Sequence, residues 1–154
     1  MSTGRIVAGA LALSAAGLVA IANFEGFSDK AYQPIPGDKL TIGFGSTAGV
    51  SAGDTISVPE ALGRLKNDAT EAEAAVRECI IVGRKQHEFD AFVSLAFNIG
   101  RQAFCSSTLV RKANAGDYAG ACAEILRWHY SQGQSVPGLV ARRHAEYRQC
   151  MGAQ

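Results

Sequence analysis

The stretch from Phe24 to Thr47, FEGFSDKAYQPIPGDKLTIGFGST, constrains the fold more than any other part of this chain. It starts with Glu25 at the end of an apolar run and passes through a short extended segment and a Pro/Gly turn that carries Asp38. It then finishes in the β-like run Leu40–Gly45. An apolar helical run followed by a turn and a strand predicts a fold that mixes helices with a small sheet.

Glu25 and Asp38 are the candidate catalytic pair in this stretch. Hydrolysis of a glycosidic bond needs one carboxylic acid that stays protonated and serves the leaving oxygen. It also needs a carboxylate that stays ionised and handles water or the developing cation. Glu25 lies between Phe24 and Phe27, which suits the first role, and Asp38 lies in a polar turn, which suits the second. Because such residues are also common at helix ends and in turns, their types alone leave an ordinary structural role open.

Several short motifs, taken together, identify a family. The stretch contains Glu25-Gly26, Tyr32, the run Thr41–Gly45 (Thr-Ile-Gly-Phe-Gly) and Thr47. These resemble the active-site segment of the bacteriophage-type lysozymes, the endolysins that cut peptidoglycan. The resemblance covers nearly everything after residue 20. Its further matches are Gln86-x-x-Phe89-Asp90-Ala91, Phe97-Asn98-Ile99-Gly100, Ser107-Thr108-Leu109, Asn114-Ala115-Gly116-Asp117, Arg127-Trp128 and Gly138-Leu139-x-x-Arg142-Arg143.

One position departs from the family pattern. The family's usual Asp lies nine residues after the Glu, and Pro34, which cannot act as a base, occupies that position here. The resemblance implies Glu25 as the general acid and Thr41 as a residue that helps to hold the water. Asp38 is the nearest replacement for the missing carboxylate, in a turn that is one residue longer before Thr41. Asp29, or no second carboxylate at all, are the alternatives.

An uncharged run of nineteen residues, Ile6 to Phe24, precedes Glu25 and follows Arg5. As a helix it would span about 28 Å, close to the thickness of the hydrocarbon core of a bilayer. The positive charge on its N-terminal flank predicts an N-terminus inside the cell and the bulk of the chain outside. Nine of the nineteen residues are Ala or Gly, which makes the run a weak membrane anchor.

Three interpretations of this run remain open. The tripeptide Ala20-Ile21-Ala22 matches a signal-peptide cleavage pattern, but cleavage there would leave Glu25 without its helix. A permanent membrane span is disfavoured by the Ala and Gly content. The third is a resemblance to the signal-arrest-release element of some phage endolysins, which enters the membrane uncleaved and later joins the folded enzyme. Helical spacing of Leu18, Ile21 and Glu25 would then bury one face and hold Glu25 at the cleft.

The third interpretation implies a division of the chain and two locations. Residues 1–24 would be the membrane segment that becomes the first helix, and residues 25–154 would be the catalytic domain. The protein would first lie inactive in the host inner membrane, with its N-terminus inside and its C-terminus outside. It would then be released into the periplasm.

The four cysteines form an even set without a Cys-x-x-Cys pair, and the three histidines are scattered. We therefore expect no metal site and no cofactor. An even cysteine set is useful in an oxidising compartment. Four cysteines allow three pairings. Cys122 lies near the start of one predicted helix and Cys150 at the end of the next, which favours Cys122 with Cys150 and leaves Cys79 with Cys105.

The net charge of +1 is too small to indicate a nucleic-acid partner. Basic residues do gather at Arg142, Arg143 and Arg148 and at Arg111 and Lys112. Such clusters are typical both of contact with an anionic cell-wall polymer and of an ordinary exposed helix face.

The rest of the chain reads as helices. Residues 57–60, Ser-Val-Pro-Glu, are typical of a capping box. Apolar residues at helical spacing behind it predict a helix of about twenty residues, which by the resemblance joins two lobes. A helix from Lys85 to Asn98 carries the expected core of the second lobe: Phe89, Phe92, Val93, Ala96, Phe97 and Ile99. Further helices are expected from Ser106 or Ser107 to Asn114, from Asp117 to about Tyr130, and from Pro137 to Cys150.

These features predict an α+β, mainly helical, two-lobed lysozyme-like fold. A small β-containing N-terminal lobe, a long connecting helix and a helical C-terminal lobe would leave the substrate cleft between the lobes. The resemblance implies a monomer that lyses the host cell by hydrolysing the β-1,4 bond between N-acetylmuramic acid and N-acetylglucosamine in peptidoglycan. The alternatives are a lytic transglycosylase that uses Glu25 alone and a non-catalytic, membrane-anchored wall-binding protein.

Overall fold

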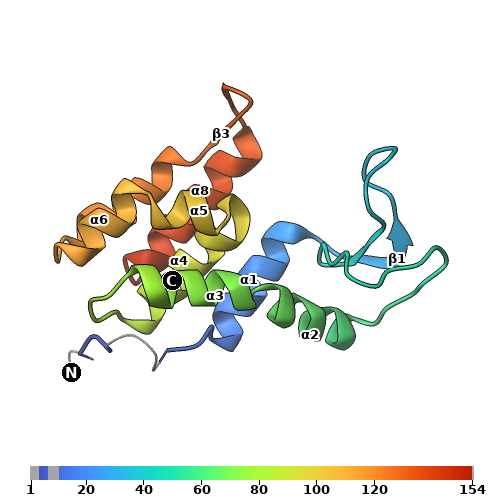
Figure 1. Cartoon of the computed structure of the whole chain (residues 1–154), viewed down its shortest axis with the longest axis horizontal. Coiled ribbons are helices and arrows are strands. Elements are labelled where there is room, and N and C mark those ends of the chain that lie inside the picture. Colours follow the sequence, from blue (N-terminus) through green and yellow to red (C-terminus); the bar gives the residue numbers. More distant parts are fainter. Residues whose placement is uncertain (1–3, 7–10, 154) are drawn as a thin grey trace. The chain divides into compact units, whose positions relative to one another are not determined.

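The computed structural model describes residues 4–6 and 11–153, and it consists mainly of helices with two small antiparallel strand pairs (Figure 1). Residues 18–70 form one unit, and the other described residues, up to 17 and from 71 onward, form the second. The division falls inside the first helix, α1, and next to the start of α3. The expected α+β, mainly helical fold is confirmed.

The unit of residues 18–70 contains the predicted hairpin. Its elements are the greater part of α1 (Ala15–Glu25), β1 (Ser28–Tyr32), β2 (Thr41–Gly43) and α2 (Val58–Asp68). Strands β1 and β2 pair antiparallel, with Tyr32 opposite Thr41. On its other side β1 is bonded to residues 54–56: the Ala31 N–H donates to the Asp54 carbonyl at 2.9 Å, and the two segments also form the bridge between Lys30 and Thr55.

Helix α2 begins at the predicted capping box. The Ser57 side chain accepts a hydrogen bond from the Glu60 N–H, and the Glu60 carboxylate accepts one from the Ser57 N–H. Both bonds satisfy backbone N–H groups that a helix start otherwise leaves unpaired. The helix then packs on β2 at Gly43, where a Cβ would lie 2.9 Å from the Cβ of Ala61. Only glycine allows this approach, and it also adopts φ +65° there.

The second unit is helical around one apolar core. Its elements are α3 (Thr70–Cys79), α4 (Gln86–Ile99), α5 (Arg101–Cys105), α6 (Thr108–Asn114), α7 (Tyr118–Glu124), the 3-10 helix η1 (Ile125–Arg127), β3 (Tyr130–Ser131), β4 (Gln134–Ser135) and α8 (Pro137–Cys150). Helix α4 contacts both α5 and α8. Fully buried core residues include Phe89, Phe92, Leu95, Phe104, Leu109 and Ile125. Phe97 and Ile99, which were expected in this core, are only half-buried.

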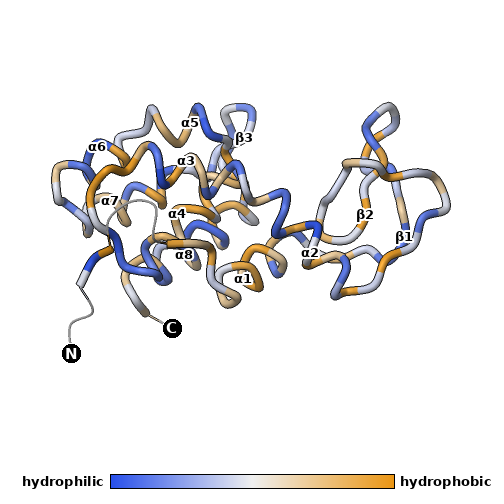
Figure 2. The backbone as a smooth tube through the Cα atoms, turned by 60° about the horizontal axis from the view of Figure 1, so that its bottom comes forward, coloured by the Kyte–Doolittle hydropathy of each residue, from blue (hydrophilic) through white to orange (hydrophobic). Residues whose placement is uncertain are grey.

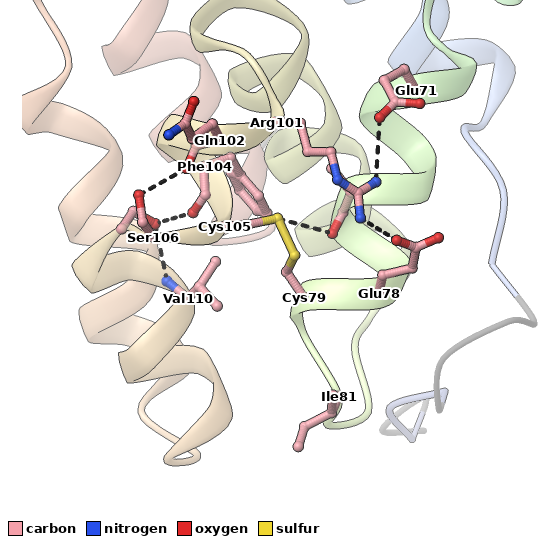
Figure 3. The surroundings of a disulfide bond; sticks show 12 residues. Glu71, Glu78, Cys79, Ile81, Arg101, Gln102, Phe104, Cys105, Ser106 and Val110 are labelled. Carbon is pink, nitrogen blue, oxygen red and sulfur yellow. Dashed lines mark hydrogen bonds and ion pairs between the residues drawn. A yellow bond between two sulfur atoms is a disulfide. The ribbon is translucent and has the colours of Figure 1, made fainter.

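Two disulfides close this unit, in the pairing that the sequence favoured. Cys79 at the end of α3 joins Cys105 at the end of α5, and Cys122 in α7 joins Cys150 at the end of α8. Figure 3 shows the first disulfide beside Arg101, which pairs with both Glu71 and Glu78 of α3. The helices of this unit are therefore tied covalently at two separate places.

Two helix predictions differ from the structure. The connecting helix is present as α2 and α3 in succession, with Ala69 between them. The helix expected to reach about Tyr130 ends at Glu124 and is followed by η1 and the hairpin of β3 and β4. The hairpin forms because Gln132 and Gly133 both adopt positive φ, at 50° and 77°, which suits a two-residue turn. The helix from Pro137 to Cys150 is confirmed as α8.

The basic cluster of α8 lies inside the unit. Arg142 and Arg143 are buried, and both contact the fully buried carboxylate of Glu146 at 3.0 and 2.9 Å. The hydroxyl of Ser94 on α4 donates to the same carboxylate at 2.7 Å. Burial lowers the pKa of Arg143, because a low-dielectric interior disfavours its charged form. The interpretation of these two arginines as an exposed, wall-contacting face is therefore wrong.

Only part of the uncharged run is helical. Helix α1 covers eleven residues, Ala15–Glu25, and is apolar along most of its length (Figure 2). Residues 11–14 are not helical, and residues 1–3 and 7–10 of the predicted membrane segment, residues 1–24, lie outside the described residues. Within the part of the chain that the structure describes, every helix is too short or too polar to cross a bilayer.

Candidate active site

Glu25 is the last residue of α1, and its side chain is half-buried. The helix ends there because Gly26 adopts φ +73° while its N–H still donates to the Ala22 carbonyl at 3.1 Å. A glycine in this left-handed conformation is the commonest way to end a helix. The Glu25-Gly26 pair therefore sets the carboxylate at a defined helix end, with the chain turning away directly after it.

The turn that follows β2 approaches the Glu25 carboxylate. Ile42 and Ser46 exchange two backbone hydrogen bonds, at 2.9 and 3.0 Å, and close this turn. Inside it Gly45 adopts φ +91°, and a Cβ at this position would lie 3.8 Å from Oε2 of Glu25. The Gly43-x-Gly45 motif thus serves two contacts, since Gly43 receives α2 and Gly45 faces the carboxylate.

Phe27, two residues after Glu25, forms an aromatic pair with Phe44. The rings of Phe27 and Phe44 have centroids 5.2 Å apart, with Phe44 buried and Phe27 exposed over 43% of its surface. This contact packs the segment directly after Glu25 against the turn that follows β2.

Thr41 is buried at the start of β2, in register with Tyr32. Its hydroxyl donates to the Lys39 carbonyl at 3.3 Å, a long hydrogen bond that leaves the oxygen able to accept. Thr41 is thus held in the same unit as Glu25, on the strand that leads into the glycine turn.

Asp38 lies in the exposed loop between β1 and β2. Its N–H donates to the Ile35 carbonyl at 2.9 Å, and Gly37 between them adopts φ +92°. Pro36 and Gly37 occupy the two central positions of this turn, as in a type II turn. Among the described residues, the Asp38 carboxylate forms no hydrogen bond or ion pair, while its backbone carbonyl accepts from Gln33 at 2.7 Å. The turn predicted at this place is present.

Pro34, at the family's usual Asp position, and the alternative carboxylate Asp29 are also exposed. Pro34 lies in the same loop, and Asp29 is part of β1. The Asp29 carbonyl accepts from the Ile56 N–H at 2.9 Å, so its backbone serves the edge of the sheet.

Some residues that shape the site were not identified from the sequence. Ser46, which closes the glycine turn, donates its hydroxyl to the Asp68 carboxylate at 2.6 Å near the end of α2. The glycine spacing was visible in the sequence, but nothing local connects Ser46 with a residue twenty-two positions later. Among the described residues, no cluster of His, Cys, Asp and Glu is suited to a metal ion.

Comparison with known proteins finds similarity to phage lysozymes and endolysins. The family model of phage lysozyme matches residues 22–146. An endolysin of Acyrthosiphon pisum secondary endosymbiont phage 1 is 41% identical over 138 residues, which cover 87% of this chain and 94% of the relative. A SAR-endolysin of Enterobacteria phage P21 is 34% identical, with 84% of this chain and 79% of the relative covered. The match with the endolysin of Bacillus phage B103, 40% identical, covers 87% of this chain but about half, 52%, of that longer protein.

Solved structures share the fold. A point mutant of P22 lysozyme has a TM-score of 0.85 and 31% identity, with 92% of this chain and 99% of that chain covered. The endolysin from Escherichia coli O157:H7 phage FAHEc1 has a TM-score of 0.84 and 35% identity, with 94% and 96% covered.

Proposed function

Because the chain belongs to the phage lysozyme family, it is a peptidoglycan-cleaving glycoside hydrolase of the endolysin type that lyses the host cell, and we propose that Glu25 is its general acid. The bond cleaved is the β-1,4 bond between N-acetylmuramic acid and N-acetylglucosamine. The observation that carries the assignment is the half-buried Glu25 carboxylate at the end of α1, facing Gly45. A protonated carboxyl group there donates to the leaving oxygen as the glycosidic bond breaks.

Asp38 and Thr41 complete the proposed chemistry. Asp38 replaces the carboxylate that is absent at Pro34, and it orients the attacking water or stabilises the oxocarbenium-like state. Its turn lies three residues before Thr41, whose hydroxyl helps to hold the water. The Asp38 side chain is exposed, and its carboxylate forms no hydrogen bond or ion pair among the described residues, so it is available for this role.

The test of the assignment is Glu25→Gln. This change keeps size and hydrogen bonding but removes the transferable proton, so lysis of purified peptidoglycan should be abolished while thermal stability stays near normal. Asp29→Asn is the matched control, since it also removes one carboxylate from the same unit and should leave the rate unchanged. Lysis by Glu25→Gln at close to the wild-type rate would contradict the assignment.

A lytic transglycosylase remains the second candidate, favoured by Pro34 at the family's Asp position. Such an enzyme works with a single acid and needs no water-activating carboxylate. The reducing ends of the released muropeptides distinguish the two: hydrolysis gives free reducing sugars, and a transglycosylase gives 1,6-anhydro sugars.

The N-terminal segment is proposed to occupy two places in turn. Residues 1–24 first enter the host inner membrane, with the C-terminus outside, and then leave it to form α1, so that residues 25–154 act in the periplasm. The uncharged run behind Arg5 supports this, as do relatives named SAR-endolysin. Inserted protein should be inactive, and collapse of the membrane potential should release active enzyme. Active enzyme that begins at Asn23 would instead support a cleaved signal peptide.

A further inference from the structure

Asp90 of α4 is a buried carboxylate outside the proposed catalytic machinery. It is 4% exposed and accepts hydrogen bonds from three donors. These are the Ser14 N–H at 3.0 Å, the Ser14 hydroxyl, and the side-chain amide of Gln86 at 2.9 Å. A buried carboxylate is costly unless it is well bonded, so these donors define where the Ser14 backbone lies.

Ser14 is the residue directly before α1, and it begins that helix. Its hydroxyl oxygen accepts from the Gly17 N–H at 3.0 Å, which satisfies one of the free N–H groups of the first turn. Asp90 therefore binds both polar groups of the residue that starts α1. Its negative charge also lies at the positive end of the helix dipole.

Gly17 permits this approach. A Cβ at position 17 would lie 2.7 Å from the Asp90 carboxyl carbon and 2.9 Å from one of its oxygens. Real Cβ atoms do not come so close, and Asp90 is held by its three donors and cannot easily move away. We name Ser14, Gly17, Gln86 and Asp90 the α1 clasp.

The residues before the clasp are held by neighbouring polar groups. Gln86 also donates to the Ala12 carbonyl at 2.8 Å, and the Leu13 N–H donates to the Glu73 carboxylate at 3.2 Å. Arg77 donates to the Leu11 carbonyl at 3.2 Å. Consecutive residues up to Ser14 are therefore each tied to α3 or α4, so the direction in which α1 starts is determined by several bonds.

We propose that Asp90 is a positioning residue for catalysis, which acts by setting the start of the helix whose last residue is Glu25. The inference rests on the proposed role of Glu25. From the first to the last residue, α1 is about 15 Å long, so a tilt of about 5° at its start moves the far end by about 1 Å. A misplacement of that size at a reacting group can cost about a hundredfold in rate.

The first test compares Asp90→Ala with Asp90→Asn on soluble, uncrosslinked glycan strands of peptidoglycan, at a temperature where every variant is folded. Asp90→Ala should lower kcat at least tenfold with KM within about threefold, because substrate binding is kept while the acid is misplaced. The basic limb of its pH–rate profile should shift, since the surroundings of the acid change. Asparagine can still accept from the Ser14 N–H and bond its hydroxyl, so Asp90→Asn should stay within about threefold of wild type.

The matched control is Arg5→Gln. It removes an ion pair with Glu88, at 3.2 Å, from the same N-terminal segment but outside the clasp. Its kcat should equal that of the wild type. An equal loss of kcat in Arg5→Gln and Asp90→Ala would show that any loosening of the segment matters, and it would overturn a specific role for Asp90.

A double-mutant cycle tests the close approach itself. Gly17→Ala alone should lower kcat about tenfold, because its methyl group pushes against the Asp90 carboxylate. In the Asp90→Ala background the same change should cost no more than about twofold, since the Asp90 atoms are gone and the remaining neighbour, Cδ1 of Leu13 at 2.8 Å, is the end of a flexible side chain that can move. Additive effects of the two substitutions on kcat would contradict the proposed contact between position 17 and Asp90.

Hydrogen exchange of the α1 amides separates this inference from the proposed function. Asp90→Ala should speed exchange in residues 18–25 at least tenfold relative to Arg5→Gln. Unchanged exchange and unchanged kcat would overturn the role of Asp90 while leaving Glu25 as the acid. If instead Glu25→Gln remains active, the proposed function fails, and with it the role of Asp90 in catalysis, even where α1 loosens.

Discussion

Residues 18–70 and residues 71–153 are built by different means. The first unit holds Glu25, Asp38 and Thr41. Besides α2 and the greater part of α1, it contains a three-residue strand, a five-residue strand, long exposed connections and glycines at positive φ. The second unit holds both disulfides, most of the buried aromatic residues and the buried ion cluster around Glu146. The difference indicates that changes in the second unit, apart from the α1 clasp, should alter stability, and changes in the first should alter rate.

The largest effect is expected from the ion cluster. Glu146→Gln removes the buried carboxylate charge that pairs with the fully buried Arg143 and should lower the free energy of unfolding by about 3 to 5 kcal/mol. The folded fraction should keep its wild-type kcat. Urea unfolding measures the first quantity and initial rates the second. Glu71→Gln, whose carboxylate is 71% exposed in its pair with Arg101, should cost less than about 1 kcal/mol. Equal losses of unfolding free energy in Glu146→Gln and Glu71→Gln would contradict the view that the buried ion cluster stabilises the second unit.

The disulfides come next in size. Replacing Cys122 and Cys150 with alanine should lower stability by about 3 to 4 kcal/mol on the chain-entropy model, for a sequence separation of 28. The pair Cys79 and Cys105, with a separation of 26, should give nearly the same loss, which makes each pair the control for the other. Neither double variant should change kcat while folded. A loss of activity without a loss of stability would show that this unit takes part in the chemistry.

Asp38→Asn should affect rate rather than stability. We expect kcat/KM to fall at least a hundredfold, about 2.7 kcal/mol in transition-state stabilisation, with an unchanged unfolding midpoint. Asp29→Asn, which alters another exposed carboxylate of the same unit, should stay within about twofold. If Asp38→Asn also remains active, the single-acid transglycosylase becomes the better interpretation, and the product analysis should show 1,6-anhydro ends.

The smallest effect is expected at the glycine turn. Gly45→Ala introduces a methyl group 3.8 Å from the Glu25 carboxylate in a backbone with φ +91°, so activity should fall about tenfold and stability by about 1 kcal/mol. Gly49→Ala is the matched control, because φ is +67° there and a Cβ meets nothing within 4 Å. It should show a similar loss of stability with normal activity. Equal activity losses would mean that strain, and not proximity to Glu25, is the cause.

Features decided by neighbouring residues could be read from the sequence. The capping box at Ser57, the last helix from Pro137 and the turn at Pro36-Gly37 all depend on residues within four positions, and the structure has each of them. The family motif around Glu25 and Thr41 also lies in one continuous stretch, so the fold class and the activity followed from it. The favoured disulfide pairing required only the order of the helices.

Other features depended on residues that are far apart in the chain. Arg142 and Arg143 look like an exposed basic face until Ser94 of α4 is known to lie beside Glu146. The approach of Gly17 to Asp90 joins positions more than seventy residues apart, and a lone Gly in an apolar run carries no sign of it. The local sequence pattern shows which face of a helix or strand is apolar. Only the packing of distant elements decides which polar groups come into contact. For that reason the sequence by itself indicated Glu25 as the candidate acid, and the tertiary structure revealed what holds the start of its helix.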